Sequence, residues 1–147
     1  EGEPPPLRHE FAHLLSHRRW GRPRTYWLSE GVAVFAVGHC AGKSLHAWAL
    51  AASDSGDPLT LESLVPFDFS RAAPHLIAGS FVQHVAERHG IDAVRALWLG
   101  GMTASRSATG LSAEALEAEW IAHLRTLGTT DARRGMDVAG IVRCEGE

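Results

Sequence analysis

Residues 7–18 read LRHEFAHLLSHR, a segment whose apolar side chains recur at helical spacing. Leu7, Phe11, Leu14 and Leu15 carry this pattern, in which residues three or four positions apart share one face of a helix. Three prolines directly precede the segment, and proline suits the first turn of a helix although it cannot continue one. We therefore predict that residues 7–18 form the first helix of the chain.

Four further helices are predicted from the same kind of pattern. Apolar stripes, glycine stops and a serine that can cap a helix start give the ranges 27–37, 73–88, 91–99 and 112–127. Residues 44–52 are expected to continue the second helix beyond a kink at Gly42, and residues 60–64 to form one short helical turn. No convincing strand periodicity appears in this part of the chain.

These patterns predict a mostly α fold of about five helices, within one domain that spans residues 7–127. A Pro-rich segment at 1–6 precedes the domain, and a polar tail at 128–147, a candidate for disorder, follows it. The length of 147 residues, 45% of them hydrophobic and 21% charged, suits one ordinary globular domain.

The first predicted helix contains an HExxH motif, His9-Glu10-Phe11-Ala12-His13. Positions four apart lie on one face of a helix, so both imidazoles can reach the same tetrahedral metal ion. Glu10 lies about 100° around the helix from His9, which lets its carboxylate approach a metal-bound water without binding the metal. The motif therefore predicts His9 and His13 as ligands of one zinc ion and Glu10 as the catalytic carboxylate.

Glu30 is the candidate third ligand. A catalytic zinc site usually has three protein ligands and one open position. Glu30 lies near the start of the second predicted helix, and Gly21 and Pro23 supply a turn that lets this helix fold back against the first. We therefore predict that Glu30 completes the zinc site.

The motif HEFAH (9–13) and the segment WLSEGVAVF (27–35) together resemble the gluzincin branch of zinc peptidases, the peptidase MA-like group; 16 residues separate His13 from Glu30. HLIAGSFVQHV (75–85), followed by ERHG (87–90), is similar to a later helix of those domains. Glu119-Trp120 lies where they carry a tryptophan in their last helix. The resemblance spans about residues 7–120, and HExxH with WLSEG is its most specific part. It implies that the helices are the active-site portion of a zincin-like fold.

The resemblance implies peptide-bond hydrolysis by a zinc-activated water, with one zinc ion per chain held by His9, His13 and Glu30. Zinc lowers the pKa of its bound water and polarises the scissile carbonyl, while Glu10 takes the proton and passes it to the leaving amine. Related enzymes stabilise the oxyanion with a tyrosine or histidine across the cleft, and by position His75 fills that role here.

Two features of the gluzincin peptidases have no counterpart in this sequence. Those domains place a β-sheet before the HExxH helix, whereas eight residues precede His9, so we expect the sheet to lie upstream or to be absent. Some of them also carry an acidic residue one turn after the glutamate ligand, where this chain has Val34, which leaves the partner that orients the zinc histidines unidentified.

Two alternatives to a peptidase therefore stay open. One is a non-catalytic zinc-binding or helical scaffold module that binds a partner, and the other is an enzyme whose zinc-activated water attacks a substrate other than a peptide. The presence of Glu10 favours an enzyme, because a structural zinc needs no general base and is more often closed by a fourth protein ligand.

The remaining histidines lack the spacing of a ligand set, and we interpret them as structural: His17, His39, His46, His84, His89 and His123.

The composition limits the partners of the chain. A net charge of −3 gives no basic surface for nucleic acid, and the longest uncharged stretch, about 12 residues, is shorter than a membrane-spanning helix. The chain begins at Glu1 without an initiator methionine or a leader, so we expect it to be a piece of a longer product. The expected partner is a peptide or protein substrate. The pattern indicates neither the substrate's identity, nor the choice between exopeptidase and endopeptidase, nor oligomeric state, nor compartment.

Overall fold

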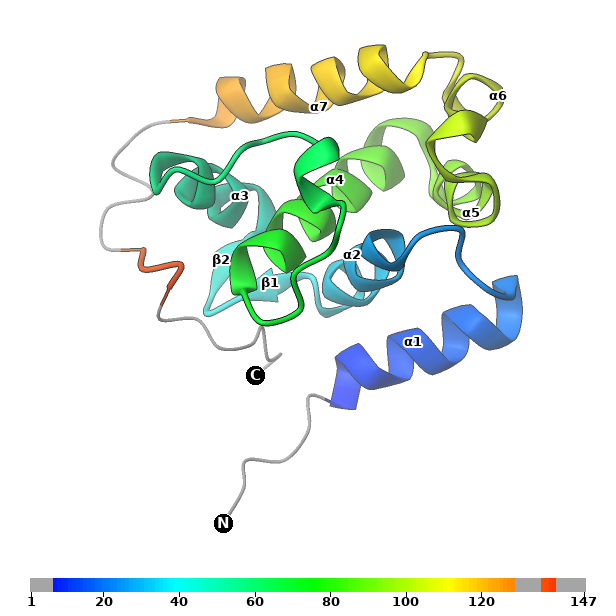
Figure 1. Ribbon diagram of the computed structural model, residues 1–147, viewed down its shortest axis with the longest axis horizontal. Coiled ribbons are helices and arrows are strands. Elements are labelled where there is room, and N and C mark those ends of the chain that lie inside the picture. Colours follow the sequence, from blue (N-terminus) through cyan, green and yellow to red (C-terminus); the bar gives the residue numbers. More distant parts are fainter. Residues whose placement is uncertain (1–6, 129–135, 140–147) are drawn as a thin grey trace.

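The computed structural model describes residues 7–128 and 136–139 (Figure 1). This part of the chain is mostly helical, as predicted. It contains six α-helices of ten or more residues and one of five residues: α1 (Leu7–Trp20), α2 (Tyr26–Val37), α3 (Leu45–Asp54), α4 (Ala72–His89), α5 (Ile91–Gly100), α6 (Ser105–Thr109) and α7 (Ala113–Leu127). Two short 3₁₀ helices, η1 (Glu62–Leu64) and η2 (Gly101–Ala104), complete the helical segments.

The five predicted helices correspond to α1, α2, α4, α5 and α7, with ends that differ by at most two residues. Ser112 caps α7 as predicted, because its side chain accepts a hydrogen bond from the Ala115 amide. The short α6 has no counterpart among the predicted helices.

The expectation that residues 44–52 continue the second helix is wrong. α2 ends at Gly38, which adopts φ 87°, and a small antiparallel hairpin follows, formed by β1 (His39–Cys40) and β2 (Lys43–Ser44). The two turn residues, Ala41 and Gly42, both have positive φ, the conformation of a two-residue hairpin turn. The Ser44 side chain then caps a new helix, α3, so the hairpin separates the two helices.

α2 and α4 lie side by side in the middle of the molecule, where Figure 1 shows α3, α5 and α7 around them. Glycines allow this close approach. A side chain at Gly31 would place its Cβ 2.8 Å from the Ala78 backbone oxygen, and one at Gly79 would place its Cβ 2.5 Å from a methyl carbon of Val34. α2 is consequently buried on almost every face, and Glu30 is held next to the close contact at Gly31.

α1 lies at the edge of the bundle and packs against α2 (Figure 1). Ala12 is its only fully buried residue. The apolar stripe that predicted the helix faces solvent, since Leu7, Phe11, Leu14 and Leu15 are each between 55% and 62% exposed. Such an exposed apolar row is unusual on a monomer surface. The face of α1 that meets α2 carries histidines instead.

The described residues contain no helix that is both long enough and apolar enough to cross a bilayer. In the predicted tail, Val138 is buried in the core and Met136 packs against it. The predicted Pro-rich segment at 1–6 and residues 129–135 and 140–147 of the tail lie outside the described residues.

The contact between α2 and α4 can be tested with Gly31→Ala. Alanine favours a helix over glycine by about 1 kcal/mol, but here its methyl group meets a backbone oxygen that cannot move without shifting α4. We expect a net loss of about 1–2 kcal/mol in the free energy of unfolding, measured by urea denaturation. Ala36→Leu, at an exposed position of the same helix, is the control and should stay within about 0.5 kcal/mol of the parent. A Gly31→Ala protein as stable as the parent would contradict this account of the packing.

Candidate metal centre

His9, His13 and Glu30 converge where α1 crosses α2. The Nε2 atoms of the two imidazoles are 3.1 Å apart. His9 Nε2 lies 3.2 Å from Glu30 Oε2, and His13 Nε2 lies 3.4 Å from Glu30 Oε1. Atoms that bind one zinc ion at 2.0–2.1 Å with tetrahedral angles are about 3.3–3.4 Å apart. The three side chains therefore already have nearly the separations that a shared zinc ion requires.

The turn between the two helices is fixed by Trp98 of α5. Its indole N–H donates to the Gly21 carbonyl at 3.0 Å, and its own carbonyl accepts from the Arg24 amide at 2.7 Å. Gly21 adopts φ 83°, which lets the chain reverse directly after α1. The buried tryptophan thus sets how α2 returns along α1, and with it the distance between the HExxH face and Glu30.

Ser29 supplies the partner for His13 that the sequence left unidentified. Its hydroxyl lies 3.0 Å from His13 Nδ1 and 3.4 Å from His17 Nε2. A proton on His13 Nδ1 donated to Ser29 leaves the lone pair of Nε2 directed at the metal position. Ser29 is buried on a helix that is otherwise mostly apolar, and this isolated polar residue next to Glu30 was the signal available in the sequence.

The charges of the site favour a cation. Burial by itself raises the pKa of the Glu30 carboxyl, but hydrogen bonds from His13 and His9 outweigh it and lower that pKa to about 2. The hydrogen bond between His13 and Glu30 raises the pKa of His13, although the partial burial of the ring lowers it. The nearby Glu10 charge adds to the rise. The carboxylate is thus ionised, and the two imidazoles need either a proton or a metal ion to balance it.

Glu10 lies beside this group without taking part in it. No hydrogen bond or ion pair to another residue of the described chain is found for its exposed carboxylate, and it lines the same cavity. The cavity measures about 670 Å³, within the range of small-molecule and peptide-binding clefts. Its walls are formed by residues of α1, α2, the 69–71 segment and the start of α4: His9, Glu10, His13, His17, Tyr26, Ser29, Glu30, Val34, Phe69, Ser70, Arg71, Ala72 and His75.

His75 faces the same centre from the first turns of α4. Its Nε2 lies 3.6 Å from Glu30 Oε2, and its Nδ1 lies 2.8 Å from the Arg71 carbonyl oxygen. A carbonyl oxygen only accepts, so Nδ1 carries the proton and donates. Nε2 then offers a lone pair when the ring is neutral and an N–H when the ring is charged. The Phe67 ring packs edge-on against the imidazole, with a centroid distance of 4.8 Å, and holds its orientation.

The donor set fits zinc. Two imidazole nitrogens and one carboxylate oxygen form a ligand set found in catalytic zinc sites, and Co²⁺, Ni²⁺ and Cu²⁺ can compete for such a set. Among the described residues, this group is one of three His and Glu clusters whose ligand atoms lie within 4.8 Å of one another. The sequence predicted its three members, but it predicted neither of the other two groups, whose histidines were interpreted as structural. His39 belongs to none of the three and is exposed.

No protein-family model, curated protein or solved structure matches this chain. The gluzincin resemblance consequently stays a hypothesis, and a function for this chain has to be inferred from its residues and their geometry.

The lowered pKa of Glu30 predicts how pH affects the metal-free protein. The folded pKa of about 2 lies below the ordinary value of 4.5, so the interaction stabilises the fold above pH 4.5 and is lost as pH falls from 4.5 towards 2. After chelator treatment, this interaction should cost the parent up to about 3 kcal/mol in its free energy of unfolding as the pH falls through this window. Glu30→Gln lacks the carboxylate and should not show that loss. Urea unfolding measures both proteins. Glu62→Gln, at an exposed position, is the control and should follow the parent. Parallel curves for the parent and Glu30→Gln would show that the pairing with His9 and His13 does not form.

Proposed function

We propose that this chain is a zinc-dependent peptidase of the gluzincin type. It binds one Zn²⁺ through His9, His13 and Glu30 and hydrolyses peptide bonds with Glu10 as general base. The observation that carries the proposal is the set of three side chains whose facing nitrogen and oxygen atoms are 3.1–3.4 Å apart, beside a Glu10 carboxylate that lines the same cavity.

When bound, zinc supplies a polarised carbonyl and a water of lowered pKa. Glu10 is placed to accept a proton, because its carboxylate is not engaged by another residue of the described chain and faces the cavity next to both histidines. The same carboxyl can then release that proton to the leaving amine. When His13 carries its proton on Nδ1 and donates it to Ser29, its Nε2 is left free for the metal.

The cavity suits a peptide better than a small polar ligand. The rings of Tyr26 and Phe69 pack edge-on on one wall, with their centroids 6.3 Å apart. The Phe67 ring packs edge-on against Phe69, with a centroid distance of 5.0 Å. The Tyr26 and Phe69 rings line the cavity and offer an apolar surface for a substrate side chain close to His75. Arg71 lines the cavity too, but its guanidinium is held by Asp57 at 2.6 Å, which weakens it as a docking point for a free carboxylate.

One observation favours the alternative of a non-catalytic zinc module. His75 Nε2 is 3.6 Å from Glu30 Oε2, close enough to become a fourth ligand with little movement. A zinc ion with four protein ligands would be a structural site with no open position. In the peptidase proposal, His75 instead carries a proton on Nε2 and donates to the oxyanion of the substrate.

The proposed ligand set predicts the metal content of variants. Protein purified without chelator is expected to contain zinc in this centre. His13→Ala and Glu30→Ala should each lose it, because two remaining ligands bind zinc weakly. Glu10→Gln should retain zinc and lose peptidase turnover by at least about 100-fold, because it keeps the ligands and removes the base. Elemental mass spectrometry and cleavage of a fluorogenic peptide library measure the two effects.

His39→Ala is the matched control, since it removes an exposed histidine from outside the centre. It should keep both zinc and activity. A zinc content that does not change in His13→Ala and Glu30→Ala would contradict the ligand set. A Glu10→Gln protein as active as the parent would contradict the mechanism while leaving the metal site intact.

His75→Ala separates the catalytic proposal from the structural one. As an oxyanion donor, His75 should be dispensable for zinc binding, and its loss should lower kcat by about 10²–10³-fold with a small change in KM. As a fourth ligand, its loss should weaken zinc affinity, because a ligand is removed. Competition with a chromogenic chelator measures the affinity, and kinetics at saturating zinc measures kcat. Two results together would establish the scaffold alternative: a weakened zinc affinity in His75→Ala, and no peptidase activity in the parent protein.

A further inference from the structure

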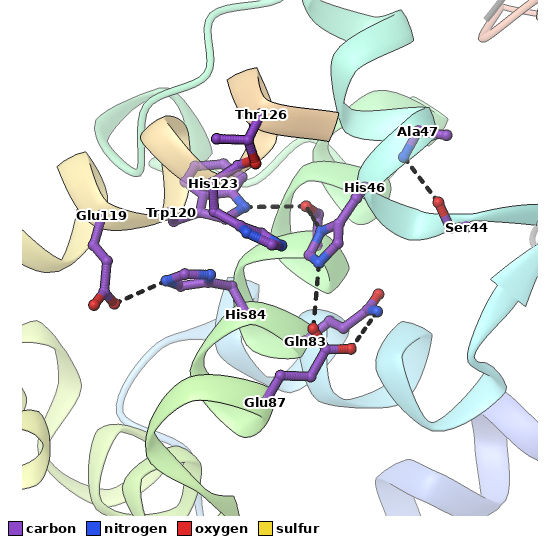
Figure 2. Close-up of polar contacts among 11 residues, drawn as sticks. Ser44, His46, Ala47, Gln83, His84, Glu87, Glu119, Trp120, His123 and Thr126 are labelled. Atoms are coloured by element: carbon purple, nitrogen blue, oxygen red, sulfur yellow. Dashed lines mark hydrogen bonds and ion pairs between the residues drawn. The ribbon is translucent and has the colours of Figure 1, made fainter. Parts of the chain in front are cut away.

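A second group of imidazoles and carboxylates lies at the other end of α4. It brings together residues of α3, α4 and α7 that are far apart in the sequence: His46, His84, Glu87, His89, Glu119 and His123. Figure 2 shows the rings of His46, His84 and His123 gathered between these helices. His75 and Glu87 both lie on α4 and are 12 residues apart, which corresponds to about 18 Å along a helix. This group is therefore separate from the centre formed by His9, His13 and Glu30.

Part of this second group is closed by its own hydrogen bonds. Glu119 Oε2 lies 2.9 Å from His84 Nε2 and 2.7 Å from His89 Nε2. The carboxylate thus accepts from both imidazoles, and each of these nitrogens already has a partner. We interpret His84, His89 and Glu119 as a hydrogen-bonded cluster that joins α4 to α7.

The other part leaves a buried ligand atom without a partner. His46 is 5% exposed, and its Nδ1 lies 2.8 Å from the Ser80 hydroxyl. Its Nε2 is buried, makes no hydrogen bond, and is directed towards Glu87 Oε2 at 3.7 Å, which is beyond hydrogen-bond distance. The His123 ring lies next to it, with a centroid distance of 5.2 Å. Ligand atoms of His46, Glu87 and His123 all lie within 4.8 Å of one another.

Unpaired buried atoms are concentrated here. Of the four buried side-chain polar atoms without a hydrogen-bond partner in the described chain, three belong to this region: His46 Nε2, Gln83 Oε1 and His84 Nδ1. Buried polar atoms are nearly always paired in folded proteins, so such a concentration needs an explanation, and a bound ion is one.

Neighbouring residues orient the ligands. The Trp120 indole N–H donates to Ser80 Oγ at 3.0 Å, which fixes the hydroxyl that holds His46 Nδ1. Gln83 Nε2 donates to Glu87 Oε1 at 2.7 Å, which leaves Oε2 facing His46 (Figure 2). A proton on His46 Nδ1 given to Ser80 leaves the Nε2 lone pair available, the usual arrangement for a metal-binding histidine. The gap of 3.7 Å can close to the tetrahedral separation because the Glu87 side chain is half exposed and can adjust.

We propose that His46, Glu87 and His123 bind a second divalent transition-metal ion of the zinc class, which links α3, α4 and α7. Two imidazole nitrogens and one carboxylate oxygen suit Zn²⁺, Co²⁺, Ni²⁺ or Cu²⁺ better than Mg²⁺ or Ca²⁺, which prefer oxygen ligands alone. An ion there satisfies His46 Nε2. It also holds α7 to the bundle, so its binding stabilises the fold.

The test uses the full chain with the first centre removed by the double change His13→Ala and Glu30→Ala. We expect this protein to bind one Zn²⁺ per chain by elemental mass spectrometry after dialysis. We also expect zinc to raise its Tm by about 5 °C or more. Adding His123→Ala or Glu87→Gln should remove both effects. These two side chains are half-buried and exposed respectively, so their loss leaves the core intact, which far-ultraviolet circular dichroism checks.

Two matched histidine variants make the test specific. His39→Ala, added to the same double variant, should retain the ion, because this histidine is exposed and outside the cluster. His89→Ala should also retain it, because it belongs to the neighbouring cluster around Glu119. No zinc in the double variant, or zinc that survives both His123→Ala and Glu87→Gln, would overturn the proposal. Loss of zinc in His89→Ala would overturn it by placing the ion at Glu119. Zinc retained in the double variant and lost with His123→Ala supports it even if the first centre proves not to bind metal.

Discussion

The close packing of α2 against α4 determines where Glu30 can lie. Gly31 and Gly79 have no side chains, and this lets the two helices approach until a Cβ at either position would overlap the other helix. Glu30 and Ser29 directly precede Gly31, on the part of α2 that α1 covers. Once α2 is fixed against α4, the carboxylate and the hydroxyl have one orientation, and α1 meets them with the histidines of its HExxH motif.

The electrostatics of the centre follow from that placement. A carboxylate that is mostly buried is costly to ionise unless positive charge or hydrogen-bond donors are close. His9 and His13 supply both, which is why the pKa of Glu30 falls to about 2 although burial opposes the change. The two Nε2 atoms lie 3.1 Å apart, and each also lies within 3.4 Å of a Glu30 oxygen, so the ligand atoms of the three side chains surround one position. A divalent cation at that position would satisfy all three side chains at once, as the proposed function requires.

The helices and the grouping of His9, His13 and Glu30 were predictable because their signals are local. Helical spacing, glycine stops and the Ser112 cap located five of the helices, and HExxH states on one helix which two side chains can share an ion. To predict Glu30 as the third member of the group, it was enough to recognise the turn that folds the second helix back against the first. The hairpin at residues 39–44 was missed because each of its strands is two residues long, too short to show the alternating pattern of a strand.

The sequence was less informative about what each face contacts. The apolar positions of α1 correctly predicted a helix, but they are exposed, and the polar face is the one that packs. Periodicity reports that a helix has two faces, and tertiary contacts determine which of them is covered. Ser29 and the group around His46 share this limit, since their partners lie 12 to 77 positions away in the chain.

α4 connects the two histidine-rich regions through one rigid element. Its first turns carry His75 to the cavity, and its last turns carry Glu87 and His84 to the groups shared with α3 and α7. An ion bound near Glu87 would restrain the end of α4 that is far from the cavity, whereas the proposed ligands of the first centre lie on α1 and α2. Of the residues that face the first centre, His75 is the one that α4 itself carries. The first centre opens on a cavity that Glu10 also lines, which the peptidase proposal requires, whereas the second group lies between three helices, which the proposed structural link requires.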